Sequence, residues 1–217
     1  MSSAMSSPGE QSAVSVDVVV LRFDRDLRRA LVAVAPRPHE PYAGTLALPG
    51  VLLHRGERLT EAARRAASTK AGLPLRACGQ LATFDTPHRD PRGPTLSLAM
   101  WGVTNVAGDA ATWANMDDLP ELAFDHARIV KDTRPVLAGK LWRDRDFTQA
   151  LTGDSFPVAD AVSLVASLDG ESPDRGNLNR ALRATHGLTR TDQVQHVYGS
   201  GRPSSIWRWE QPLSSLS

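Results

Sequence analysis

Residues 48–57 read Leu48-Pro49-Gly50-Val51-Leu52-Leu53-His54-Arg55-Gly56-Glu57. Apolar residues recur at helical spacing after them, which predicts a helix over residues 59–71 with an apolar face formed by Leu59, Ala62, Ala63, Ala66 and Ala67. Gly72 follows, and glycine commonly ends helices because it adopts the left-handed conformation without a Cβ clash. A strand, a tight loop and a helix are therefore expected in succession.

The spacing of this stretch resembles the Nudix box, the loop-helix-loop of enzymes that hydrolyse nucleoside diphosphates linked to another group. That motif runs Gly, five residues, Glu, seven residues, then Arg-Glu-apolar-any-Glu-Glu-any-Gly-apolar. Glu57, Arg65, Gly72 and Leu73 match their motif positions, whereas Val51 replaces the first Gly. The resemblance implies a Nudix-like α/β/α sandwich with a mixed sheet.

The three later Glu positions of the motif are occupied by Ala66, Thr69 and Lys70. Positions i, i+3 and i+4 share one helix face, so three Glu there would form the carboxylate cluster that holds Mg²⁺ against a diphosphate. A lysine on that face would repel a divalent cation and attract a phosphate directly. The sequence therefore predicts no catalytic residue, no metal site and no required cofactor, and favours a binding domain over an enzyme.

The composition of the 217 residues, 41% hydrophobic and 23% charged with a net charge of +1, is that of a soluble globular protein. No apolar run approaches the ~20 residues that span a bilayer, and the Ser-rich start lacks the features of a signal peptide. The single cysteine, Cys78, excludes an intrachain disulfide. These features predict a cytoplasmic protein without a membrane partner.

Apolar runs predict an N-terminal sheet domain over residues 14–141, preceded by a disordered tail over residues 1–13. Strands are expected at residues 15–23, 29–35, 45–48, 75–84 and 95–103. The segment at residues 113–119 is expected to be a loop, and residues 124–141 a helix that Pro135 ends or kinks.

A second domain is expected over residues 142–210, followed by a tail at 211–217. Helices are predicted at residues 146–151, from Pro157 to Gly170, and from Ser172, as N-cap, to about Gly187. Residues 153–155 are expected to form a turn, and strands at 188–198 and 204–209 would form a wing. The fold class is therefore α+β, with a winged helix-turn-helix after the sandwich.

The C-terminal domain concentrates positive charge, since residues 175–208 contain six arginines and one acid, Asp192. Arginine can pair with guanine edges and phosphates, and asparagine with adenine edges. This pattern favours contact with double-stranded DNA. A small helical domain with a basic surface, or a winged helix that binds protein, fits the same pattern. The candidate DNA-binding residues are Arg175, Asn177, Asn179, Arg180, Arg183, Arg202 and Ser204.

The order of a degenerate Nudix domain and a winged helix resembles the NrtR-type family, the Nudix-related transcriptional regulators of NAD metabolism. The likeness is carried by Arg89-Asp90-Pro91-Arg92-Gly93, Leu122-Ala123-Phe124-Asp125-His126, Gly139-Lys140-Leu141, Asp174-Arg175-Gly176-Asn177-Leu178 and Gly201-Arg202-Pro203. The resemblance implies a homodimeric repressor that binds palindromic operators of NAD biosynthesis or salvage genes. It also implies that the Nudix domain senses ADP-ribose or a related nucleotide.

Candidate residues for the anionic effector are Arg37, His54, Glu57, Arg65, Lys70, Arg89 and Arg92. Each could equally be a surface charge or an intrahelical pair, and the loop at residues 85–93 could be a solvated hairpin tip. His126 is expected to be structural, at the start of a helix.

Two alternatives to the regulator stay open. The first is a metal-dependent Nudix hydrolase that uses Glu57 with Asp85, Asp90 or Glu61, since Mg²⁺ often needs only one or two carboxylates plus substrate phosphates. The second is a nucleotide-dependent scaffold that binds protein through its winged helix.

Overall fold

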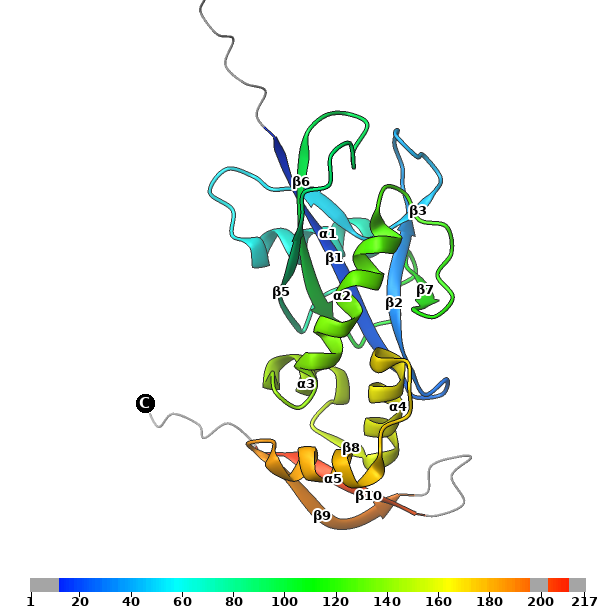
Figure 1. Cartoon of the computed structure of the whole chain (residues 1–217), viewed down its shortest axis with the longest axis vertical. Helices are drawn as coiled ribbons and strands as arrows, with labels where there is room; N and C mark the ends of the chain where they lie inside the picture. The colour runs from blue at the N-terminus through cyan, green and yellow to red at the C-terminus, as the bar shows by residue number, and fades with distance from the viewer. Residues whose placement is uncertain (1–11, 196–202, 211–217) are drawn as a thin grey trace, which may run out of the picture.

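The computed structural model describes residues 12–195 and 203–210. A large mixed sheet with helices on its faces lies at one end of the molecule, and a smaller unit of helices and a short sheet lies at the other (Figure 1). Among the described residues no helix is both long and apolar enough to cross a membrane.

The large sheet has seven strands in the order β3-β2-β1-β6-β5, with β4 paired to β1 and β7 paired to β2. The pairing of β1 with β6 is parallel and the other pairings are antiparallel, so the sheet is mixed, as the sequence predicted. The strands are β1 (Ala13–Asp24), β2 (Arg29–Pro36), β3 (Leu46–Ala47), β4 (Gly50–Leu52), β5 (Ala77–Phe84), β6 (Thr95–Val103) and β7 (Thr112–Asn115).

Strand β1 is central because it is buried on both faces. Successive side chains of a strand point to opposite faces, so Val18 and Val20 pack on one side while Val19 and Leu21 pack on the other. Helix α1 (Leu59–Ala71) covers the first side with its alanines and ends at Gly72, whose φ is +67°, as predicted. Helix α2 (His126–Lys140) covers the second side.

One expectation for the sheet domain is wrong, and another is wrong in part. Residues 112–115 form β7 instead of a loop, because the segment pairs with β2 far away in the sequence. Pro135 was expected to end or kink the helix, and α2 does not end there but continues to Lys140. Proline removes the hydrogen bond to the carbonyl four residues earlier, that of Lys131. Lys131 is exposed, so water can bond that carbonyl.

The C-terminal unit contains the winged-helix elements that the sequence predicted. Its elements are α3 (Arg145–Thr152), β8 (Ser155–Pro157), α4 (Val158–Asp169), α5 (Arg175–Ala184), β9 (Leu188–Gln195) and β10 (Ser204–Trp209), with sheet order β8-β10-β9. Trp207 and Trp209 pack with Leu178 and Leu182 of α5 in its core.

Two local expectations are corrected here. Helix α5 begins at Arg175 instead of after Ser172, because the Asp174 carboxylate accepts a hydrogen bond from the Asn177 N–H at 2.8 Å and caps the helix. Ser155 starts β8, which pairs with β10, so the turn expected at residues 153–155 is shorter.

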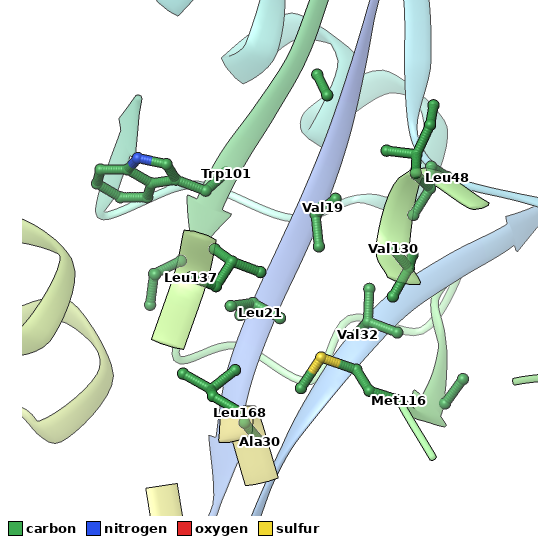
Figure 2. Packing of buried hydrophobic residues seen from close by; sticks show 14 of the residues in the cluster. Val19, Leu21, Ala30, Val32, Leu48, Trp101, Met116, Val130, Leu137 and Leu168 are labelled. Carbon is green, nitrogen blue, oxygen red and sulfur yellow. The ribbon is translucent and has the colours of Figure 1, made fainter. Parts of the chain in front are cut away.

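The two units share one hydrophobic core. Phe147 and Leu151 of α3, and Leu164 and Leu168 of α4, are buried in the same cluster as the α2 side of the large sheet. Figure 2 shows Leu168 among side chains of β1, β2 and α2. The boundary expected after residue 141 falls between α2 and α3, but the packing continues across it.

Candidate functional site

A cavity of about 370 Å³ opens beside β1, β2 and β4, next to the start of α2 and to the 85–93 loop. Its size is in the range of small-molecule sites, ~300–1,000 Å³. Six of the seven candidate effector residues line it, namely Arg37, His54, Arg65, Lys70, Arg89 and Arg92. The seventh, Glu57, does not line the cavity but holds Arg65.

Asp17 of β1 lies in the cavity wall and is almost completely buried. One oxygen, Oδ2, accepts hydrogen bonds from the hydroxyls of Ser97, at 2.5 Å, and Ser15, at 3.0 Å. The other oxygen, Oδ1, lies 3.6 Å from His126 Nε2. These bonds make the carboxylate a fixed negative charge next to the ligand space.

His126 is the first residue of α2, and its ring is buried. The ring Nδ1 accepts a hydrogen bond from the Leu48 N–H at 2.9 Å, which places the ring proton on Nε2, facing Asp17. Burial lowers the pKa of His126, so the ring is neutral at neutral pH. The histidine thus joins the Nudix-box strand to α2, the structural role that was expected.

Arg89 lines the cavity and is both buried and paired with carboxylates. Its Nη2 and Nε donate to the two carboxylate oxygens of Asp125 at 2.6 and 3.1 Å, and Nη2 lies 3.6 Å from Asp17 Oδ2. Only 4% of the Arg89 side chain is exposed. Arg89 therefore fixes the 85–93 loop to the start of α2, so this loop is more than a solvated hairpin tip.

Phe124 supplies an aromatic surface in the cavity. The guanidinium carbons of Arg37 and Arg92 lie 4.5 and 5.7 Å from its ring centre, and Tyr42 packs against the ring edge at 4.9 Å. Arg92 is held by Asp90 through contacts of 2.6 and 3.0 Å, which lower the pKa of that carboxyl. Arg37 and Arg92 therefore place positive charge beside an aromatic ring, an arrangement that suits a flat, electron-rich ligand group such as a nucleobase.

Glu57 and Arg65, two of the four residues that match the Nudix box, bind each other. Arg65 Nε and Nη2 donate to the Glu57 carboxylate, both at 2.8 Å, and Nη2 also donates to the Leu52 carbonyl at 2.9 Å. The Arg65 hydrogen bonds, with one from the His54 N–H, lower the pKa of Glu57 to about 2. Glu57 is therefore an ionised carboxylate whose two oxygens are both engaged.

The α1 face that would carry the metal carboxylates does not fit a divalent cation. Ala66 is buried, and the Thr69 hydroxyl donates to the Arg65 carbonyl at 2.7 Å. Lys70 is exposed and lines the cavity. Over residues 12–195 and 203–210, no group of three or more His, Cys, Asp or Glu could hold a metal ion.

The second candidate surface is helix α5. It buries Leu178 and Leu182 and exposes the five side chains expected to contact DNA, Arg175, Asn177, Asn179, Arg180 and Arg183. In the part of the chain that the structure describes, none of these arginines forms an ion pair. Their charges are therefore available to phosphates.

The two remaining DNA-binding candidates have different outcomes. Ser204 is buried, and its hydroxyl accepts a hydrogen bond from the Ala159 N–H at 3.1 Å. It therefore caps the first turn of α4 and is not available for DNA contact, which corrects the expectation. Arg202 lies outside the described residues.

The sequence reasoning did not select Asp17, Phe124 or His126 as ligand-site residues. Phe124 and His126 belong to the Leu122–His126 stretch that carries the family likeness, which was the signal that could have found them. Asp17 had no local signal, because its partner Ser97 lies on another strand.

Comparisons with known proteins identify the family and the fold. No protein-family model matches the sequence. An ADP-ribose pyrophosphatase of Methanocaldococcus jannaschii is 35% identical over 127 residues, covering 55% of this chain and 72% of the relative.

Solved structures extend the similarity to the whole chain. Shewanella oneidensis NrtR complexed with a 27mer DNA superposes with a TM-score of 0.73 at 20% identity, over 91% of this chain and 93% of that one. The Nudix domain of the same protein, complexed with ADP-ribose, gives a TM-score of 0.52 at 22% identity, over 59% and 90% of the two chains. The chain thus belongs to the Nudix family, and its fold is that of the Nudix-related regulator NrtR.

Proposed function

We propose that this protein is a ligand-responsive transcriptional regulator, a repressor of NAD biosynthesis or salvage genes. Its Nudix cavity binds ADP-ribose or a related nucleotide without hydrolysing it, and its winged helix binds operator DNA. The observation that carries the proposal is the combination of a cation-lined Nudix cavity without metal carboxylates and a winged helix with unpaired arginines.

The cavity supports a nucleotide ligand through three kinds of group. Phe124, flanked by Arg37 and Arg92, offers a stacking surface. Lys70 offers a positive charge to phosphates, and buried Asp17 offers a carboxylate that can accept hydrogen bonds from hydroxyls. The likeness to an ADP-ribose pyrophosphatase and to an ADP-ribose complex supports ADP-ribose as the first compound to test.

Operator binding is supported by the exposed, unpaired arginines of α5 and by the likeness to a DNA-bound NrtR. Winged-helix regulators commonly place two recognition helices about one DNA turn apart, ~34 Å. We therefore propose that the protein acts as a homodimer on a palindromic site.

A hydrolase is the second candidate function, because the 35% identical relative is an ADP-ribose pyrophosphatase. In this chain both Glu57 oxygens are engaged by Arg65, and Lys70 stands where the motif has a carboxylate. Turnover of ADP-ribose with Mg²⁺ or Mn²⁺ that Glu57→Gln abolishes would establish the hydrolase.

The deciding experiment is a gel shift on DNA upstream of the chain's own gene and of nearby NAD genes, with and without ADP-ribose. Chromatography of the ligand after each incubation reports whether it is consumed. We expect a sequence-selective shift that ADP-ribose changes while the ligand remains intact. No selective shift at any salt concentration would reject the regulator and favour the hydrolase or the protein-binding scaffold.

A further inference from the structure

Lys70 is the unpaired group on the α1 face of the cavity. Its ammonium forms no hydrogen bond or ion pair with any described residue, whereas Arg65 on the same helix is paired with Glu57 and also donates to the Leu52 carbonyl. The side chain is exposed and lines the cavity. Lys70 is therefore a flexible cation that a ligand in the cavity could contact.

Most of the cations in the cavity wall are paired with carboxylates. Arg65 is paired with Glu57, Arg89 with Asp125, and Arg92 with Asp90. Among the described residues, Arg37 and Lys70 are the cavity cations that form no ion pair, and Glu40 is a lining carboxylate that forms none. Of these two cations, Lys70 is the one on α1, at a position where the motif has a metal-binding carboxylate.

The α1 face has no carboxylate at positions 66, 69 and 70 that could bind a divalent cation. A carboxylate-bearing helix would add negative charge to that of the diphosphate, so the ligand could bind only with a metal between them. Here the ammonium of Lys70 repels a metal ion and attracts the diphosphate directly. The requirement for a metal is removed together with the groups that would bind it.

We propose that Lys70 takes the electrostatic place of the divalent cation, so that the cavity binds the diphosphate of its ligand without metal. The inference rests on the proposed function, in that the ligand is taken to be a diphosphate-linked nucleotide. It adds that Lys70, and no metal ion, supplies the charge that holds the diphosphate.

Calorimetric titration with ADP-ribose in excess EDTA and in millimolar Mg²⁺ tests the inference. We expect the wild-type protein to bind equally tightly in both buffers, and Lys70→Met to weaken binding about tenfold in both, the loss of one charge-assisted contact. The matched control is Lys131→Met, an exposed lysine of α2 outside the cavity, which should bind as the wild type does. A wild-type affinity that rises tenfold with Mg²⁺, or a Lys70→Met protein that binds normally, would overturn the inference.

A converse variant restores the carboxylates on the exposed part of the helix. Thr69→Glu with Lys70→Glu changes two exposed positions, so the fold should tolerate it, as circular dichroism can verify. We expect it to lose binding in EDTA and to gain affinity when Mg²⁺ is added. Equal binding by this variant and the wild type in EDTA would contradict a role for Lys70.

Inorganic pyrophosphate separates this inference from the proposed function. If pyrophosphate binds in EDTA through Lys70 but ADP-ribose does not, the metal-free site stands and the nucleotide assignment fails. If ADP-ribose binds without metal but leaves operator binding unchanged, the site stands and the regulator fails. If neither compound binds in EDTA, the inference is rejected.

Discussion

Gly50 lies against the buried carboxylate of Asp17, and a Cβ at position 50 would come within 2.3 Å of Asp17 Oδ1. The carboxylate cannot easily move, because Ser15 and Ser97 hold its other oxygen. We expect Gly50→Ala to lower the free energy of unfolding by about 1–3 kcal/mol, measured by urea denaturation.

The control is Gly139→Ala in α2, where an added Cβ meets no atom within 4 Å. Alanine there should be neutral or stabilise by about 0.4–1 kcal/mol, because it reduces the freedom of the unfolded chain. Equal effects at the two positions would show that Asp17 does not require glycine at position 50.

The ion pair of Glu57 and Arg65 predicts an acid-dependent contribution to stability. The pKa of Glu57 falls from 4.5 to about 2 on folding, so its contribution is complete above pH 4.5 and is lost as the pH falls towards 2. Carboxyl-carbon NMR titration should place the Glu57 pKa near 2 in the wild type. Arg65→Gln should move it back towards 4.5, and an unchanged value would assign the shift to another cause.

At the scale of single residues, the sequence predicts which residues line the cavity when those residues belong to one short motif with fixed spacing. Six of the seven effector candidates line the cavity, and five of them come from the box and the 85–93 loop, short segments whose spacing is fixed. Whether a charge is free depends on partners far away in the chain. Arg89 meets Asp125, 36 residues later, and Asp17 meets Ser97, 80 residues later. No local pattern encodes those pairs.

Among the elements, α5 presents the charges that we assign to DNA. Arg175→Ala with Arg180→Ala should weaken operator binding and reduce the slope of log Kd against log salt by about 2, since each phosphate contact contributes about 0.9. The control is Lys131→Ala with Arg143→Ala, which removes the same charge at exposed positions outside α5. An unchanged slope in the α5 variant would exclude this helix from phosphate contact.

Element types were predictable where periodicity was long, as in α1 and β1. Short strands form because they pair with strands that are distant in the sequence. The sequence therefore did not predict β7, which is hydrogen-bonded to β2. Helix starts also depended on side-chain contacts. Ser172 and Asp174 are both suitable caps by residue type, and the structure uses Asp174 because its carboxylate reaches the Asn177 N–H.

For the whole molecule, the shared core predicts cooperative unfolding. Leu168 of α4 is 1% exposed within the cluster of the large sheet, so Leu168→Ala should cost about 2–5 kcal/mol. Chemical denaturation followed by far-UV circular dichroism and by tryptophan fluorescence should give one coincident transition in wild type and variant. Two separated transitions would show that the halves fold independently.

The β1–β2 turn connects two strands beside the cavity to the C-terminal unit. Arg25 donates to the Thr152 carbonyl at 2.8 Å, and Arg28 donates to the Ala159 carbonyl at 3.1 Å, at the start of α4. If ADP-ribose changes operator affinity, Arg25→Ala with Arg28→Ala should bring the ratio of operator Kd values with and without ligand closer to 1. Linkage requires the same change in the effect of DNA on ligand affinity.

Arg29→Ala is the control, because Arg29, the first residue of β2 directly after the turn, is exposed and its side chain makes no hydrogen bond or ion pair with a described residue. It should leave the ratio unchanged. A ratio that the double variant also leaves unchanged would show that the turn does not connect the two sites.

The packing of α4 also bears on the construction of chimeric regulators. Arg134 of α2 donates to the Ser167 and Leu168 carbonyls at 2.7 and 3.1 Å, at the last turn of α4. If the chain were divided after residue 141, the C-terminal unit would lose both the hydrogen bonds from Arg134 and the apolar surface that covers Leu164 and Leu168. If the C-terminal unit is to be fused to another protein, it must therefore include α2. Otherwise the new partner domain must be redesigned to provide an apolar surface that covers Leu164 and Leu168.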